Sequence, residues 1–171
     1  MKMFTSLLIT GLVLLTVGCE SSEVATKTDG SGRLPESQYV VDQEPTGAVP
    51  VGQARASSED GQDITLVGVI GGSTESFVEG LAAFTVVDPK VPFCAADEGC
   101  PTPWDYCCTQ DQVKDNVATV KIVDDSGQPV AQDARELLNV KELSTVVVTG
   151  KALRDDQGNL TIAANTVFVR P

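Results

Sequence analysis

The chain has 171 residues and a formal net charge of -12, from 12 Lys plus Arg against 24 Asp plus Glu, and it contains no histidine. Without histidine, Ser-His-Asp and Cys-His catalysis and histidine-ligated zinc or copper sites are excluded. The negative charge opposes nucleic acid, whose phosphates require a basic face. A hydrophobic content of 42% is typical of a globular chain, and the length allows at most one domain besides the terminal segments.

The N-terminus has the pattern of an export signal. Lys2 supplies a positive charge, and residues 4–17 form an apolar run that is too short to cross a bilayer comfortably. We therefore interpret residues 1–18 as a signal peptide.

The apolar run ends in the sequence LTVGC, in which the small residue Gly18 precedes Cys19. This ending resembles the lipobox of bacterial lipoproteins. The resemblance implies cleavage before Cys19 and acylation of Cys19, palmitate included, so that lipid chains anchor the protein to a membrane. In that family Asp after the cysteine marks inner-membrane retention, so Glu20 favours the outer membrane, facing the periplasm. An ordinary secretory signal with an accidental Cys19 is the alternative, and both interpretations predict export.

Residues 20–61 are rich in Ser, Thr, Asp, Glu, Gln, Gly and Pro. Together with the lipidated Cys19 they are predicted to form a disordered tether over 19–61. About 40 residues of flexible coil reach roughly 35 Å, which would hold a domain clear of the lipid headgroups. Residues 48–51 are the exception, since they are apolar enough to dock onto the domain.

From Asp63 onward, β-branched residues alternate with a period of two between turn signals. Residues 133–140 instead indicate one short helix, which Asp133 can cap and in which Glu136 follows three residues later. A hairpin at residues 154–159 joins the last two strands. The predicted strands cover residues 64–71, 82–88, 117–125, 145–153 and 160–169.

This order of elements resembles the OB-fold over residues 62–171. The resemblance implies an all-β, five-stranded closed barrel with one short helix between strands 3 and 4 and a cysteine-rich loop between strands 2 and 3. Gly68 lies in the middle of the first strand, where such a barrel must bend. Another small β-barrel or a sandwich is the alternative.

OB-folds often bind oligonucleotides or oligosaccharides. Residues 62–171, however, contain 16 acidic and 8 basic residues, and the basic ones are dispersed. Such a surface repels nucleic acid, so we expect no nucleic-acid partner. The function must then come from a site on the scaffold.

The loop at residues 92–108 contains the only tryptophan and all four cysteines other than Cys19. Its segment TPWDYCC resembles one in uncharacterised exported bacterial lipoproteins, a likeness that brings no known activity. An even number of cysteines in an exported domain favours two disulfides. Because a bond between the adjacent Cys107 and Cys108 would form a strained ring, we expect Cys94 and Cys100 each to pair with one of them.

Two other chemistries compete for the same four thiols. The first is a four-thiolate site for zinc, Cu(I) or an iron–sulfur cluster, although adjacent ligands are hard to aim at one tetrahedral ion. The second is redox catalysis by Cys107 and Cys108, which requires a thiolate with a depressed pKa. Their neighbours Asp105 and Asp111 would raise the pKa of a thiol instead.

Trp104 and Tyr106 are candidate partner contacts, because exposed aromatic side chains on a rigid loop are good binding anchors. The alternative for Trp104 is a side chain folded back over the loop. No catalytic constellation is evident elsewhere. We therefore predict a non-enzymatic envelope lipoprotein, membrane-anchored and without a cofactor, that binds an unknown envelope protein or glycan. The alternative is a thiolate metal-binding or thiol-redox protein.

Overall fold

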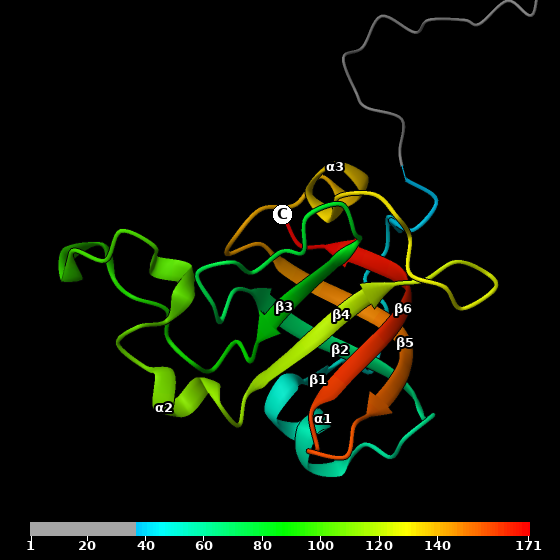
Figure 1. The fold of residues 1–171 in the computed structure, drawn as a ribbon, viewed down its shortest axis with the longest axis horizontal. Coiled ribbons are helices and arrows are strands. Elements are labelled where there is room, and N and C mark those ends of the chain that lie inside the picture. The colour runs from blue at the N-terminus through cyan, green and yellow to red at the C-terminus, as the bar shows by residue number, and fades with distance from the viewer. Residues whose placement is uncertain (1–36) are drawn as a thin grey trace, which may run out of the picture. The chain divides into compact units, whose positions relative to one another are not determined.

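The computed structural model describes residues 37–171, and the predicted signal peptide and Cys19 lie outside this part of the chain. Five strands close into a barrel (Figure 1). β4 and β6 pair in parallel, the other neighbours in the barrel are antiparallel, and β2 pairs with β5 to complete the circuit. The barrel strands are β2 (Asp63–Ile70), β3 (Ala83–Val87), β4 (Val117–Ile122), β5 (Thr145–Arg154) and β6 (Leu160–Val169).

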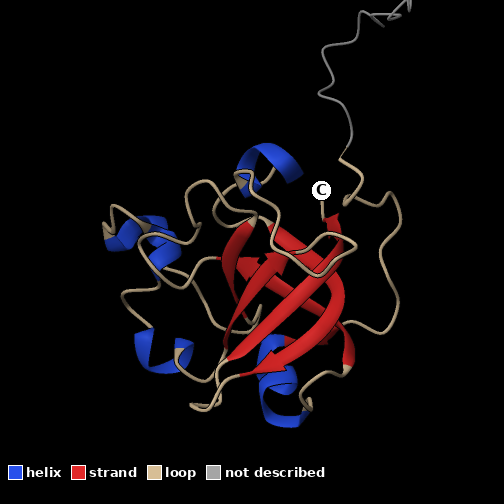
Figure 2. Cartoon of the chain, turned by 45° about the vertical axis from the view of Figure 1, so that its right-hand side comes forward, coloured by secondary structure: helices blue, strands red, loops and turns tan. Residues whose placement is uncertain are grey.

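The predicted OB-fold-like order is confirmed. The short helix α3 (Ala134–Leu138) lies between β4 and β5, which are the third and fourth barrel strands. Asp133 caps α3, because its carboxylate accepts a hydrogen bond from the amide of Arg135 at 2.8 Å. The cysteine loop lies between β3 and β4, as expected. Figure 2 shows the short helices lying around the barrel strands.

Small aliphatic residues fill the barrel, as the alternating pattern predicts. Leu66, Ile70, Val120 and Ile162 are completely buried. Gly68 faces the same core, where an added β-carbon would lie 2.8 Å from Cβ of Val86. Val69, the residue after Gly68, pairs with both β5 and β3. The pairing of β2 therefore changes from β5 to β3 directly after the glycine.

The segment before the barrel differs from the prediction. Val49–Pro50 forms β1, which pairs in parallel with β2, and Val51–Ser57 forms the helix α1. Val51 and Ala54 are completely buried in the barrel core. The prediction of a disordered tether over 19–61 is therefore wrong for these residues, because two apolar side chains three positions apart bury one face of a short helix. The expectation that residues 48–51 dock onto the domain agrees with this arrangement.

Smaller differences concern the ends of elements. β4 ends at Ile122 rather than at 125. Two short helices inside the cysteine loop and a third that follows it were not predicted. They are η1 (Ala96–Glu98), η2 (Pro103–Asp105) and α2 (Gln110–Val113). None of the helices within residues 37–171 has the length and apolar character needed to cross a bilayer.

Candidate metal site in the cysteine loop

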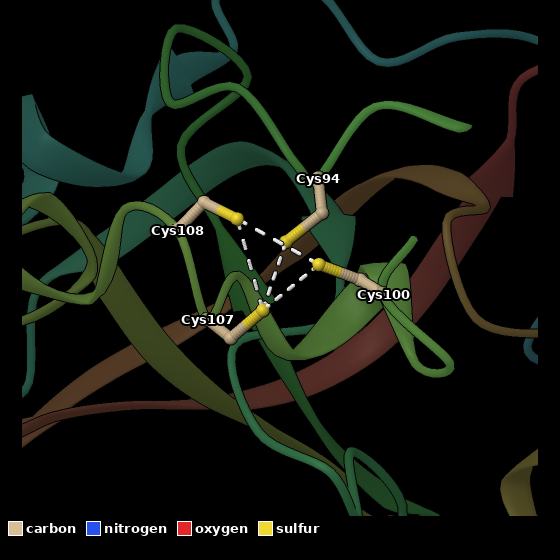
Figure 3. A group of neighbouring side chains, drawn as sticks. All are labelled: Cys94, Cys100, Cys107 and Cys108. Carbon is tan, nitrogen blue, oxygen red and sulfur yellow. Dashed lines mark hydrogen bonds between the residues drawn. The ribbon is translucent and has the colours of Figure 1, made fainter. Parts of the chain in front are cut away.

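The sulfurs of all four loop cysteines converge on one point. They come from three separate parts of the loop, yet all lie within 4.8 Å of one another (Figure 3). The contacts between them are Cys100–Cys107 at 3.1 Å, Cys94–Cys107 at 3.3 Å, Cys100–Cys108 at 3.6 Å and Cys107–Cys108 at 3.8 Å.

The cluster is buried on one side and open to solvent on the other. Cys94 is buried, Cys100 is half-buried, and Cys107 and Cys108 are exposed. The backbone of the loop closes around the buried side, where the amide of Cys94 donates to the carbonyl of Pro103 at 3.3 Å. A small ligand can therefore reach the sulfurs from the side of Cys107 and Cys108.

The adjacent Cys107 and Cys108 can both face the centre because the backbone turns sharply just before them. Tyr106 has a left-handed conformation with φ of 57°, which few non-glycine residues adopt. The carboxylate of Asp105 accepts a hydrogen bond from the amide of Cys107 at 2.8 Å, and Thr102 donates to the same carboxylate at 2.7 Å. Adjacent cysteines were expected to be hard to aim at one tetrahedral ion, and this turn is what brings the sulfurs of both within 4.8 Å of the other two.

Tyr106 fixes the loop to the barrel. Its side chain is 0% exposed and packs in a small apolar cluster with Val87, Val91 and Val113. The prediction that Tyr106 contacts a partner is therefore wrong. The left-handed turn directs its ring inward, while the sulfurs of the next two residues, Cys107 and Cys108, lie with those of Cys94 and Cys100.

Trp104 is half-buried rather than free. Its indole N–H donates to the carbonyl of Thr74 at 3.1 Å, and its own carbonyl accepts from the amide of Gly72 at 2.8 Å. The loop is thus tied to the segment that follows β2. The sequence analysis did not predict that the cysteine loop docks on the residues after β2. The signal for it is the pair Gly71 and Gly72, because successive glycines after a strand indicate a close approach of another backbone.

The predicted disulfides are not formed in this structure, in which all four thiols are free. The shortest separation between two of the sulfurs is 3.1 Å, whereas a disulfide bond measures about 2.05 Å. Disulfide formation by Cys94, Cys100, Cys107 and Cys108 therefore stays a prediction.

The thiols influence one another's ionisation. The amide of Cys108 lies against the sulfur of Cys94 and lowers the pKa of that thiol. Contact with Cys107 raises the pKa of Cys100, and contact with Cys94 raises the pKa of Cys108 to about 11. The pKa of one thiol of the cluster is therefore lowered and those of the other three are raised, and a positive charge among the sulfurs would favour ionisation of all four.

Comparison of the sequence with models of known protein families and with curated proteins finds no match. The chemical argument for this site therefore depends on its own geometry.

Proposed function

We propose that the cysteine loop binds a single thiophilic metal ion through Cys94, Cys100, Cys107 and Cys108. The observation that carries this proposal is the convergence of four sulfurs within 4.8 Å with no bond between them. A tetrahedral ion with metal–sulfur bonds of about 2.3 Å holds its sulfurs roughly 3.8 Å apart. Four of the six sulfur separations are 3.1 to 3.8 Å, and all six lie within 4.8 Å, so small shifts of the side chains bring the sulfurs to that separation.

The compactness of the cluster favours one ion over an iron–sulfur cluster. In an iron–sulfur cluster the thiolates bind different iron atoms around a core of several atoms, so they are spread apart. Here all four sulfurs surround a space for one atom. Zn²⁺ is the best match, because it takes four thiolates in tetrahedral geometry, and Cu(I) is the other soft ion that such a site selects.

Four protein ligands leave no open position on a tetrahedral ion, which is the arrangement of structural rather than catalytic zinc sites. This supports a non-enzymatic role in which the ion holds the loop in shape. The lipobox-like sequence ending in Cys19 supports export and a lipid anchor in the cell envelope. The protein would then present a metal-stabilised loop at a membrane surface.

Contact with an envelope protein through this loop is a second proposal. Phe93, next to the buried Cys94, is 49% exposed, and Trp104 of the same loop is half-buried. Exposed aromatic side chains beside a rigid site are suited to protein contact. Nucleic acid is not a proposed ligand, because residues 62–171 contain twice as many acidic as basic residues.

Metal content of the full-length chain tests the first proposal. The chain is purified in mild detergent with a reductant, equilibrated with Zn²⁺ and dialysed, and we expect one ion per chain. Co²⁺ in place of Zn²⁺ should give the intense absorption of tetrahedral thiolate coordination. The double variant Cys94→Ser/Cys107→Ser should lose both signals. Cys19→Ser is the matched control, because it removes the one cysteine outside the loop and should leave both unchanged. Failure of the wild-type chain to retain Zn²⁺, or retention by the double variant, would overturn the proposal.

A further inference from the structure

The contacts between the four sulfurs divide them into two pairs in one way. Cys94 touches Cys107 at 3.3 Å, and the remaining two sulfurs, those of Cys100 and Cys108, touch at 3.6 Å. The two remaining contacts join Cys107 to Cys100 at 3.1 Å and to Cys108 at 3.8 Å. A bond at either of them leaves Cys94 without a cysteine in contact, and a disulfide between the adjacent Cys107 and Cys108 is also a strained ring. We propose that oxidation of the loop forms the disulfides Cys94–Cys107 and Cys100–Cys108, and that this oxidised state and the metal-bound state exclude each other.

Each pair joins an exposed sulfur to a more buried one. Cys107 and Cys108 are exposed, whereas Cys94 is buried and Cys100 is half-buried. An external oxidant therefore meets Cys107 or Cys108 first. The inner cysteine of the same pair lies within 3.6 Å and can attack the mixed disulfide that results. This is the arrangement of an accessible cysteine beside a resolving cysteine.

The oxidant belongs to the class of small disulfides, such as glutathione disulfide. In the first exchange the thiolate of Cys107 bonds to one sulfur of the oxidant and releases the other as a thiol. The thiolate of Cys94 then bonds to the sulfur of Cys107 and releases the second thiol. Two protein thiols thus lose two electrons and two protons, and one disulfide of the oxidant becomes two thiols. Cys108 and Cys100 consume a second molecule of oxidant in the same way.

Exclusion follows because both states use the same atoms. One disulfide removes two of the four donors, and the second disulfide removes the others, so the ion is released as the cysteines oxidise. Conversely, a bound ion occupies the lone pairs with which a thiolate attacks a disulfide. This half of the inference rests on the proposed metal function. Exported proteins meet oxidising conditions, so the ion would decide which of the two states the loop adopts.

Peptide mapping of the full-length Cys19→Ser chain tests the pairing. This background prevents cross-links through the lipidation cysteine. After treatment with glutathione disulfide without metal, we expect a mass loss of four hydrogens per chain. Because Cys107 and Cys108 are adjacent and share one peptide, a variant that removes one of them assigns the pairing. In Cys107→Ser, Cys100–Cys108 should still form and Cys94 should be the thiol that is alkylated. A bond between Cys94 and Cys108 with free Cys100 would overturn the pairing, as would thiols that stay reduced.

The exclusion is tested separately by loading the chain with Zn²⁺ before oxidation. We expect disulfides to form more slowly than in the metal-free chain and one Zn²⁺ to be released per chain as they form. Oxidation at an unchanged rate, or full oxidation with Zn²⁺ retained, would overturn the exclusion. Zn²⁺ content under reducing conditions reports on the proposed metal function alone. If the reduced chain binds no metal, both the proposed metal function and the mutual exclusion of the two states are overturned. The disulfide pairing is then still tested by the peptide map.

Discussion

Gly71 and Tyr106 are in such close contact that there is no room for a side chain on the glycine. A β-carbon added to Gly71 would lie 2.8 Å from Cε2 of the Tyr106 ring and 2.7 Å from the carbonyl oxygen of Trp104. The cysteine loop therefore docks directly on the backbone at the end of β2. Gly71 is more than 30 residues earlier in the chain than Cys107 and Cys108, yet its contact with Tyr106 helps to hold the turn that carries these two cysteines.

Substitution of Gly71 by alanine should weaken both the fold and the metal site. The added methyl group must displace a backbone carbonyl and a buried ring, and overpacking of this kind costs about 1–3 kcal/mol of unfolding free energy. We expect lower stability in urea and a lower affinity for Zn²⁺, measured by competition with a chromophoric chelator.

Gly80→Ala is the matched control for that substitution. Gly80 has φ of 72° with nothing within 4 Å of an added β-carbon, so alanine costs roughly 1–2 kcal/mol through backbone strain alone. We expect it to lower stability while leaving Zn²⁺ affinity unchanged. Equal Zn²⁺ affinities for Gly71→Ala and the wild-type chain would show that docking at Gly71 does not support the site.

Tyr106→Phe should stabilise the domain. The hydroxyl of Tyr106 is buried without a hydrogen-bond partner among the described residues, and such a group costs about 1–3 kcal/mol. Phenylalanine keeps the ring and removes this cost, so the urea midpoint should rise. Tyr106→Ala should instead lower the unfolding free energy by roughly 3–5 kcal/mol, because it empties the cluster beneath the loop. A loss of stability in Tyr106→Phe would imply that the hydroxyl is hydrogen-bonded, for example to a buried water.

The strands could be predicted because runs of β-branched residues end at clear turn signals, and the barrel because the order of these strands and the helix resembles that of the OB-fold. It did not predict α1, because Val51 and Ala54 are too few to show helical periodicity and their partners in the core are distant in sequence. The convergence of the cysteines was equally hidden. It depends on a left-handed Tyr106, a conformation that residue type alone argues against, and on contacts with glycines more than 30 residues earlier in the chain.

Asp88→Ala should weaken the attachment of α1 to the barrel. Asp88 is buried at the end of β3, and its two carboxylate oxygens accept from the amide of Gly52 at 2.7 Å and from that of Lys90 at 3.0 Å. Loss of a hydrogen bond to a charged acceptor costs about 1.5–3 kcal/mol of unfolding free energy. We expect a lower thermal midpoint and faster amide exchange in α1. The control Asp115→Ala removes an exposed carboxylate and should change stability little, and an equal loss in both variants would contradict this role.

Ionisation of Glu44 should make the unfolding free energy of the domain depend on pH. The guanidinium of Arg170 donates to its carboxylate at 2.6 and 3.2 Å, and this hydrogen bonding lowers the pKa of Glu44. Because the pKa is lower in the folded state, the stabilisation is present above the pKa of the unfolded chain, about 4.3. It is lost as the pH falls through the folded-state pKa.

We therefore expect Glu44→Gln to have a lower thermal midpoint than the wild type at neutral pH. The difference should vanish in acid, where the carboxyl group is protonated in both states. Glu79→Gln, at an exposed carboxylate, is the control and should show no such difference at either pH. A difference between Glu44→Gln and the wild type that persists unchanged in acid would exclude ionisation of Glu44 as its cause.

Removal of the metal should loosen the cysteine loop and leave the barrel intact. Beneath the loop lies only the small cluster of Val87, Val91, Tyr106 and Val113, whereas the barrel strands share a much larger core. The loop is thus the part of the domain with the least apolar burial, so the ion should contribute most of its local stability. By mass action, free Zn²⁺ at 100 times its dissociation constant adds about 2.7 kcal/mol to the stability of the bound state.

Hydrogen exchange of the reduced full-length chain, with Zn²⁺ and with a chelator, measures this effect. We expect the chelator to accelerate exchange over residues 93–109, including the amides of Cys94 and Cys107 that are hydrogen-bonded in the loop. Exchange in β4 and β6 should not change, because their hydrogen bonds belong to the barrel. The variant Cys94→Ser/Cys107→Ser should exchange rapidly in the loop under both conditions. Equal protection of the loop with and without Zn²⁺ in the wild-type chain would mean that the loop holds its shape through Tyr106 and the segment after β2 alone.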